Sequence, residues 1–332
     1  MTTLVTGATG FLGQNLTQRL LSDGVPVRIL ARDAVAARPL VHAGAELAQG
    51  AINDADALDR ALEGVSTVYH LVGKLFVPGV PVSEYQATHV DGTRNLLERC
   101  QAVGTVTRFV HCSTTGVLGV TGPHPLDEEA PYNPTNAYEA TKLGAELLVR
   151  ERIAEGFPSA IVRPGLVYGP GDLHLLGFFR SIQRGLFRPI GRQPVLLHPI
   201  YIDDLTEGMI RCSTDPRAVG ECFHFAGREP ATIAELASAI ADALGVNAPR
   251  GYIPMAAASA LAFAGDLLPP SVRSSAPLTR SRLDFLTNSR VYVVEKARRM
   301  LDFSADTPLR EGMKKTAAWY REHGYLSTSQ VA

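Results

Sequence analysis

Residues 2–13 read Thr2-Thr3-Leu4-Val5-Thr6-Gly7-Ala8-Thr9-Gly10-Phe11-Leu12-Gly13. The run before the first glycine is apolar or β-branched, which predicts a strand, and leucines continue at helical spacing afterwards. A glycine-rich turn between a first strand and a first helix is typical of a dinucleotide-binding site. The first glycine permits the tight turn, the second lets a pyrophosphate approach the helix N-terminus, and the third lets the helix pack closely. We therefore predict cofactor contacts from Gly7, Gly10, Phe11, Leu12 and Gly13.

The second predicted strand, Val25 to Ala31, ends in Arg32-Asp33. Dinucleotide sites usually place an acid at the end of this strand, where it binds the adenosine ribose 2′-hydroxyl. Ala31 occupies that position, and the guanidinium of Arg32 can bind a 2′-phosphate by charge and paired hydrogen bonds. We therefore predict NADP as the cofactor. The alternative is that Asp33 contacts the ribose while Arg32 is solvated, which favours NAD.

Strands and helices alternate through the first half of the chain. Short apolar runs predict further strands at residues 45–49, 65–71, 108–112 and 160–162, with helices between them. This alternation predicts an α/β fold, a Rossmann-type doubly wound parallel sheet. The alternation fades after the sixth strand, so we expect a smaller C-terminal α+β lobe for substrate. His70, at the end of the fourth strand, is interpreted as a structural hydrogen-bonding residue.

Hydroxyl groups and a tyrosine–lysine pair follow the fifth predicted strand. Ser113-Thr114-Thr115 come directly after it, at the sheet edge where α/β proteins bind ligands. Residues 136–142 read Asn-Ala-Tyr-Glu-Ala-Thr-Lys, which predicts a helix start and places Tyr138 and Lys142 on one helix face. A lysine ammonium beside a phenol lowers the phenol's pKa from about 10. Such a tyrosine can exchange a proton near neutral pH.

The composition excludes several classes of protein. The chain has 332 residues and a net charge of −1, so no basic surface for nucleic acid is predicted. Its four cysteines lie far apart and its nine histidines form no His-x-x-x-His pair. We therefore expect a reducing compartment and no metal site. The chain opens with no basic region followed by an apolar one, so we expect a cytoplasmic protein.

A fourth signal completes the pattern: residues 163–171 read Arg-Pro-Gly-Leu-Val-Tyr-Gly-Pro-Gly. In this order the four signals resemble the extended short-chain dehydrogenase/reductase family, the NAD(P)-dependent epimerase/dehydratase group. The resemblance implies a Rossmann domain at residues 1–164, to which residues 195–220 return, and a substrate-binding lobe at residues 165–332. It implies Thr114, Tyr138 and Lys142 as the catalytic residues. It implies further cofactor contacts from Ala51, Ile52, Leu71, Val72, Gly73, Cys112, Tyr138, Lys142, Pro164 and Val167.

Some positions depart from the family pattern. Ala51 stands where the family often has an aspartate near the adenine, and His89 stands where it often has asparagine. Thr114 is followed by Thr-Gly rather than the Asp-Glu of the dehydratases, so we set dehydration aside. Residues 255–268 and 279–301 are similar to the 3β-hydroxysteroid dehydrogenase and dihydroflavonol-reductase-like branches.

The leading functional hypothesis is an oxidoreductase that transfers hydride between nicotinamide and a secondary alcohol or ketone, with an apolar, steroid- or flavonoid-like substrate. One alternative is a nucleotide-sugar epimerase that keeps NAD tightly bound, against which Arg32 argues. Another is a catalytically silent dinucleotide sensor or subunit. The complete set of Thr114, Tyr138 and Lys142 argues against silence, because a sensor needs only the nucleotide fold.

Two further expectations concern surfaces. Residues 255–268 are almost wholly apolar, but they are shorter than the about 20 residues of a spanning helix. We interpret them as a buried core helix; the alternatives are a lid over the substrate and a membrane-surface contact. The family resemblance also implies a homodimer through helices at Glu84–Cys100 and Asn136–Arg152. Small residues there permit close helix approach: Ala137, Ala140 and Gly144.

Overall fold

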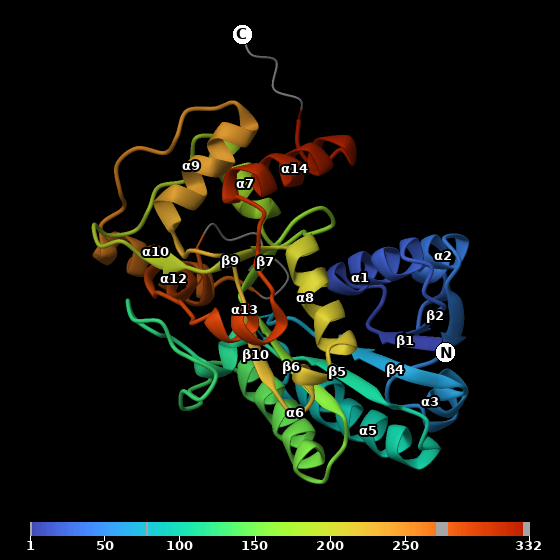
Figure 1. The fold of residues 1–332 in the computed structure, drawn as a ribbon. Coiled ribbons are helices and arrows are strands. Elements are labelled where there is room, and N and C mark those ends of the chain that lie inside the picture. Colours follow the sequence, from blue (N-terminus) through green and yellow to red (C-terminus); the bar gives the residue numbers. More distant parts are fainter. Residues whose placement is uncertain (1, 78, 270–277, 328–332) are drawn as a thin grey trace.

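The structure is a computed structural model that describes residues 2–77, 79–269 and 278–327. At its centre is a seven-stranded sheet with all neighbouring strands parallel, in the order β10-β6-β5-β4-β1-β2-β3 (Figure 1). The strands are β1 (Thr2–Thr6), β2 (Val27–Ala31), β3 (Glu46–Gln49), β4 (Val65–His70), β5 (Arg108–Cys112), β6 (Ser159–Pro164) and β10 (Cys222–Phe225). The predicted doubly wound α/β fold is confirmed.

Helices cover both faces of the sheet. On one face α1 packs against α2 and α8, and on the other α5 packs against α3 and α6 (Figure 1). In α3 the residues Leu58, Ala61 and Leu62 are buried while Asp59 and Arg60 are exposed, so the helix has one apolar face. The bounds of these helices are α1 (Phe11–Ser22), α2 (Ala34–His42), α3 (Ala55–Leu62), α5 (Gly92–Val103), α6 (Ala137–Ala154) and α8 (Ile202–Thr214).

The strand order reverses between β1 and β4. β1 pairs with β2 on one side and with β4 on the other, so the connections on the two sides run in opposite directions. In sheets of this kind ligands bind outside the carboxyl ends of the strands at the reversal. The turns after β1, β2, β4 and β5 therefore open at one common edge.

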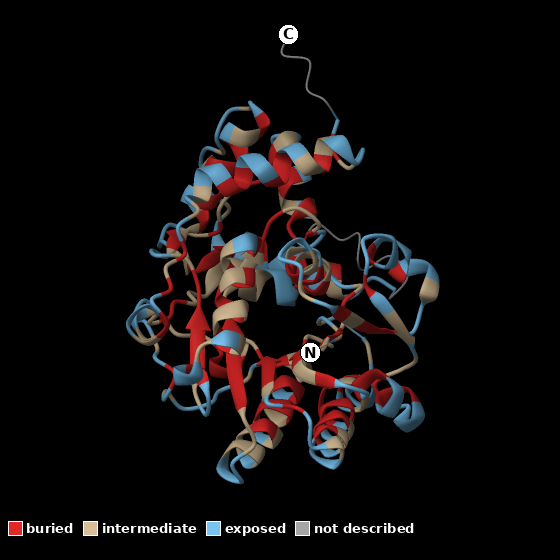
Figure 2. Ribbon diagram, turned by 45° about the vertical axis from the view of Figure 1, so that its right-hand side comes forward, coloured by how far each residue is buried: buried red, intermediate tan, exposed pale blue. Residues whose placement is uncertain are grey.

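A smaller lobe follows β6. It contains two two-stranded sheets, β7 with β9 and β8 with β11. Its core is built around Phe179, Leu236 and Tyr320, where α9 and α14 pack together. Figure 2 shows the buried residues along the central strands and on the inner sides of the helices. The elements are β7 (Leu166–Tyr168), β8 (Leu196–Leu197), β9 (Pro199–Tyr201), β11 (Ala231–Thr232), α7 (Leu176–Gln183), α9 (Ile233–Leu244), α10 (Met255–Asp266), α12 (Arg280–Thr287), α13 (Glu295–Leu301) and α14 (Leu309–Glu322).

The helix predicted at residues 84–100 is interrupted. α4 (Val82–Gln86) passes into a π-helical turn at Ala87–Asp91 and then into α5. π-Helical turns inside α-helices occur frequently at functional sites. This one carries His89, one of the residues that depart from the family pattern.

The interpretation of residues 255–268 as a buried core helix is wrong. α10 buries only Ala258, Ala262 and Gly265, which form one narrow stripe. The bulky side chains of Leu261 and Phe263 are exposed. No helix in the described part of the chain is long and apolar enough to cross a membrane.

Candidate active site

The glycine turn between β1 and α1 fits a phosphate group bound by backbone donors. Gly10 is the N-cap of α1, and no side chain caps the helix there. Among the described residues, no acceptor is bonded to the backbone N–H groups of Phe11, Leu12 or Gly13. A Cβ atom on Gly13 would lie 2.1 Å from the carbonyl oxygen of Gly7, so only glycine permits this close packing. Free N–H groups and the positive end of the helix dipole attract an anion.

His70 ties β1 and β4 to the start of α5. Its Nδ1 lies 2.8 Å from the Thr6 hydroxyl and its Nε2 lies 2.8 Å from the Thr93 hydroxyl. Burial lowers the pKa of His70 to about 3, so the ring is neutral. The prediction that His70 is a structural hydrogen-bonding residue is confirmed.

Gly7, which follows Thr6, has φ 75°, and a Cβ atom there would lie 2.7 Å from the carbonyl carbon of Leu71.

The residues after β2 have separate roles. Oδ1 of Asp33 accepts hydrogen bonds from the backbone N–H groups of Val35 at 2.8 Å and Ala36 at 3.2 Å, and so caps α2. Arg32 is exposed, and its guanidinium has no hydrogen-bond or ion-pair partner in the described chain. The arginine is therefore available to an anion, whereas the carboxylate of Asp33 is engaged by its own helix.

Thr114 and Tyr138 meet at the end of β5. Thr114 Oγ1 accepts the backbone N–H of Gly116 at 3.0 Å and caps the 3-10 turn at 115–118. The side chain of Thr114 lies beside the phenol of Tyr138 and acts to lower the pKa of that phenol. Asn136 accepts the N–H of Glu139 at 3.0 Å, so α6 starts where the sequence predicts. Two of the three predicted catalytic residues therefore lie side by side.

Lys142 lies one turn further along α6 and is 4% exposed. Its ammonium donates a hydrogen bond to the carbonyl of Cys112. Burial raises the pKa of Tyr138, and the side chain of Thr114 offsets only part of that effect. The expectation of a lowered tyrosine pKa is wrong for this structure, because burial dominates and the ammonium is directed to Cys112. A phenol with a raised pKa keeps its proton at neutral pH and can serve as an acid.

Ser113 belongs to a buried ion-pair network. Its hydroxyl donates to Glu146 Oε2 at 2.6 Å. Arg163, fully buried, donates to the two oxygens of the same carboxylate at 3.0 Å and 2.6 Å. Burial alone would raise the pKa of Glu146, but the hydrogen bonds and charge of Arg163 outweigh it and hold the pKa at about 2.

This ion-pair network fixes the positions of the segments that carry Thr114, Tyr138 and Lys142. Glu146 lies one turn after Lys142 on α6, Ser113 precedes Thr114, and Arg163 lies in β6. The ion pair therefore holds the catalytic helix against β5 and β6. Sequence analysis missed it, although the signal was present: Tyr138, Lys142 and Glu146 recur every four residues and share one helix face.

His89 links α6 to the loop after β4. Its Nε2 accepts the backbone N–H of Lys74 at 2.9 Å, and its Nδ1 lies 2.8 Å from Thr141 Oγ1. The Thr141 hydroxyl donates to the Ala137 carbonyl, so His89 carries its proton on Nδ1. Burial lowers the pKa of His89 to about 3 and keeps the ring neutral. The histidine therefore fixes the position of Lys74 beside the helix that carries Tyr138.

The other predicted cofactor residues also follow strand ends. Ala51 and Ile52 follow β3; Leu71, Val72 and Gly73 follow β4; Cys112 ends β5; Pro164 ends β6; and Val167 lies in β7. Among them, the side chain of Ile52 is buried in the core with Leu58 and Leu96, and that of Cys112 is also buried in the core. The stretch at 163–171 reaches the glycine turn, since Asn15 Nδ2 donates to the Pro170 carbonyl at 3.3 Å.

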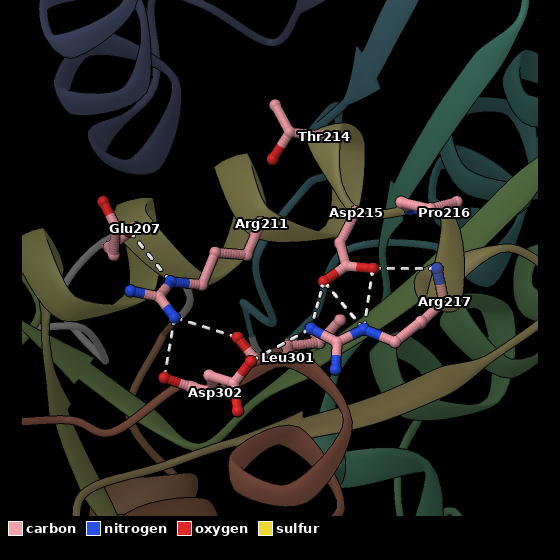
Figure 3. Close-up of a pocket in the computed structure, with 8 residues that line it drawn as sticks. All are labelled: Glu207, Arg211, Thr214, Asp215, Pro216, Arg217, Leu301 and Asp302. Carbon is pink, nitrogen blue, oxygen red and sulfur yellow. Dashed lines mark hydrogen bonds and ion pairs between the residues drawn. The ribbon is translucent and has the colours of Figure 1, made fainter.

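A second concave site lies at the C-terminal end of α8. It is a pocket of about 570 Å³ whose charged lining residues are drawn in Figure 3. Arg211 is bonded to Glu207 and to backbone carbonyls, and Arg217 is bonded to Asp215 and Asp302 (Figure 3). These charges satisfy one another, and none of the predicted site residues lines the pocket. In the described part of the chain, no group of three or more His, Cys, Asp or Glu residues could hold a metal.

The fold and the edge of the sheet together define a dinucleotide-binding α/β protein of the Rossmann type. Residues 3–225 match the profile of the NAD dependent epimerase/dehydratase family. The chain belongs to this family, whose members are NAD(P)-dependent oxidoreductases and epimerases. An NAD(P) cofactor is therefore expected, and the glycine turn fits it.

Individual relatives include oxidoreductases. The chain is 28% identical to the 4-hydroxy-2-methyl-3-oxo-4-farnesyl-3,4-dihydroquinoline-1-oxide ketoreductase of Stigmatella aurantiaca, covering 94% of this chain and 95% of that protein. It is 32% identical to a 3 beta-hydroxysteroid dehydrogenase/Delta 5-->4-isomerase of Mycobacterium tuberculosis, and this match covers 74% of this chain and 70% of that protein. The crystal structure of a UDP-glucose 4-epimerase from Thermotoga maritima matches with a TM-score of 0.79 over 97% of this chain and 99% of that one. At 20% identity this last match shows the fold alone.

Proposed function

We propose that the protein is an NADP-dependent oxidoreductase that interconverts a ketone and a secondary alcohol on an apolar substrate. The observation that carries the proposal is the position of Thr114 beside Tyr138 at the carboxyl edge of the sheet, with buried Lys142 one turn away along α6. Two relatives, a ketoreductase and a hydroxysteroid dehydrogenase, support the same class of reaction.

The catalytic roles follow from the state of each group. When bound, the nicotinamide supplies or accepts the hydride. Tyr138 keeps its proton at neutral pH because burial raises its pKa, and it gives this proton to the carbonyl oxygen of a ketone. Thr114 orients the same oxygen by a hydrogen bond. Lys142 would hold the nicotinamide ribose of a bound cofactor, and its charge would stabilise the phenolate left after proton transfer.

The preference for NADP rests on Arg32 and Asp33. The turn from Gly7 to Gly13 would hold the pyrophosphate with its free backbone N–H groups. Arg32 would hold the 2′-phosphate, since no other group in the described chain engages its guanidinium. Asp33 caps α2 with Oδ1, which draws its carboxylate toward the helix and away from a ribose contact.

An apolar substrate is supported by the loop after β4. Leu75 and Val77 are 49% and 50% exposed in this loop. The loop is held beside the reactive tyrosine, because His89 bonds the N–H of Lys74 and its ring lies 5.6 Å from that of Tyr138. Exposed aliphatic side chains on a loop that is anchored through His89 near Tyr138 favour a substrate with an apolar body.

The proposal is tested by a cofactor and substrate screen. Purified protein is incubated with NADPH or NADH and 3-oxosteroids, prenylated quinoline ketones or dihydroflavonols, with UDP-glucose as the competing substrate. We expect NADPH oxidation with a member of the ketone set and a protein that purifies without tightly bound nucleotide. Epimerisation of UDP-glucose by protein that retains NAD would establish the epimerase alternative. Tight NADPH binding with no turnover across the panel would establish the sensor.

We also propose that the chain forms a homodimer through α5 and α6. Ala140 and Leu147 are exposed along α6 and offer a surface for a second copy. Gly144 serves the chain's own packing, because a Cβ there would lie 3.0 Å from Val90 Cγ2. A monomeric mass by light scattering at micromolar protein would contradict the dimer.

The domain boundaries at 164 and 165 are part of the same proposal. β10 pairs with β6 in the main sheet, and α8 packs on α1. The contact of α8 with α1 supports the return of residues 195–220 to the cofactor-binding unit, and the pairing of β10 with β6 would extend that unit to residue 225. The remaining C-terminal elements would then form the substrate-binding lobe.

A further inference from the structure

α10 presents an exposed apolar surface on the C-terminal lobe. Leu261, Phe263 and Leu267 are 51%, 52% and 70% exposed. Met255 and Leu268 are exposed as well. We call these five residues the α10 patch: Met255, Leu261, Phe263, Leu267 and Leu268. Phe263 and Leu267, four residues apart, share the side of α10 that faces away from its buried stripe, and large apolar side chains exposed together in this way mark an interaction site.

The helix has no polar face to present to water. Its sequence from Met255 to Asp266 contains only two polar side chains, Ser259 and Asp266. Its buried stripe is made of small residues that pack on α12 and on Ile190. A helix that is apolar on all sides is normally buried, but the residues that the structure describes leave the outer side of this one uncovered.

Arginines border the α10 patch. Arg280 lies over the ring of Phe263, 5.4 Å from its centroid, and forms a loose ion pair with Asp266 at 3.5 Å. Arg192 lies over the ring of the neighbouring exposed Tyr252 at 5.0 Å and donates to its hydroxyl at 2.8 Å. Arg250 is also exposed. The chain as a whole carries a net charge of −1, so this border is locally more positive than the molecule.

We propose that the α10 patch docks the protein on an anionic lipid surface. Phe263 and Leu267 enter the boundary between headgroups and acyl chains, while the arginines meet lipid phosphates. Arginine beside an aromatic ring suits this boundary, because each side chain has an apolar body and a polar end. With 12 residues the helix lies on the membrane rather than across it.

A second copy of the chain is the less favoured occupant. A two-fold contact through the α10 patch would bring Arg192, Arg250 and Arg280 of one copy towards the same arginines of the other. Like charges repel, whereas phosphates on a lipid surface attract the same border. The inference does not depend on the proposed activity, although an apolar substrate dissolved in a membrane would then be close to the enzyme.

Vesicle sedimentation tests the proposal. The full chain is mixed with vesicles of phosphatidylcholine alone or with phosphatidylglycerol added, at low and high salt. We expect binding to the anionic vesicles that weakens with salt, because the arginines contribute through charge. The double variant Phe263→Ser/Leu267→Ser should bind at least about tenfold more weakly, since two large apolar side chains no longer leave water. The double variant Arg192→Ala/Arg280→Ala should bind anionic vesicles roughly fivefold or more weakly than wild type, with no such loss on neutral vesicles.

A matched control separates lipid binding from general loss of apolar surface. Val41 and Val219 are exposed elsewhere on the molecule, and Val41→Ser/Val219→Ser should bind vesicles as wild type does. Circular dichroism melts confirm that each variant is folded. Wild type that ignores anionic vesicles, or a Phe263→Ser/Leu267→Ser protein that binds them normally, would overturn the proposal. A dimer that the same double variant converts to monomer would show that a second copy covers the patch and would overturn it too.

Discussion

Glu146→Gln should destabilise the protein because it leaves Arg163 buried without its counter-charge. The two side chains are fully buried and joined by paired hydrogen bonds. Glutamine has nearly the volume of glutamate, so the change creates no cavity and the loss reports the charge. Removing one partner of a buried ion pair typically costs about 3–5 kcal/mol in the free energy of unfolding.

The pKa of Glu146 gives a second estimate of the free energy of unfolding that the variant loses. A carboxyl group whose pKa is held at about 2 in the folded protein instead of 4.5 contributes about 3 kcal/mol to the free energy of unfolding at neutral pH. In a chain of this size that loss should lower the melting temperature by roughly 5–10 °C. Because the folded pKa lies below the unfolded one, the contribution is complete above pH 4.5 and disappears as the pH falls towards 2.

Urea unfolding of wild type and Glu146→Gln at pH 7 and pH 4 measures this contribution. The difference between the two proteins should be about 3 kcal/mol at pH 7 and should shrink by about 1 kcal/mol at pH 4. Buried histidines titrate in the same range, but they are common to both proteins and cancel. Glu151→Gln, on the exposed side of the same helix, is the control and should change stability by less than about 0.5 kcal/mol.

The reasoning is refuted if Glu146→Gln is as stable as Glu151→Gln at pH 7. It is also refuted if the loss is large but identical at both pH values, because the ionised carboxylate would then not be its cause. Reduced catalysis together with normal stability would be a different finding. It would leave Glu146 important for the position of Tyr138 but not for holding the fold.

Other perturbations give further expected outcomes. Arg32→Ala should weaken NADP binding by about 1.5–3 kcal/mol and leave NAD binding nearly unchanged, as measured by titration of both oxidised cofactors; tighter NAD binding by wild type would contradict the NADP assignment. Gly13→Ala should lower the melting temperature and weaken cofactor binding, because the new Cβ would lie 2.1 Å from a backbone oxygen. The control Gly177→Ala has open space around it and should change neither property. Wild type should lose stability as the pH falls below 6.5, since burial lowers the pKa of His89 to about 3. In urea titrations, His89→Asn should reduce the loss between pH 6 and pH 5 by about 1.2 kcal/mol. An unchanged pH dependence would count against a neutral buried histidine.

The sequence predicts the parts of the site that depend on local backbone geometry. The spacing of Gly7, Gly10 and Gly13 is dictated by one tight turn and one close helix contact, and both are present. Asn136 predicts the start of α6, because helix capping is decided within four residues. The order of strands follows from alternation and right-handed crossovers, so the edge of the sheet is predictable as the place of the site.

Other properties depend on residues distant in the sequence. The pKa of Tyr138 is set by burial among neighbouring segments, which helical spacing from Lys142 does not reveal. The partner of Glu146 lies 17 residues away, in the next strand. The exposure of α10 also cannot be predicted locally, because an apolar sequence is the same whether or not other parts of the fold cover the helix.

The central claim is that Tyr138 transfers the proton during hydride transfer. Its most direct test is the rate of NADPH oxidation under single-turnover conditions with a ketone that wild type reduces, compared with that of Tyr138→Phe. The account predicts that the variant binds NADPH as wild type does and loses about 10²–10⁴ in rate, the usual contribution of a general acid. A Tyr138→Phe protein that reduces the ketone at the wild-type rate would contradict the account.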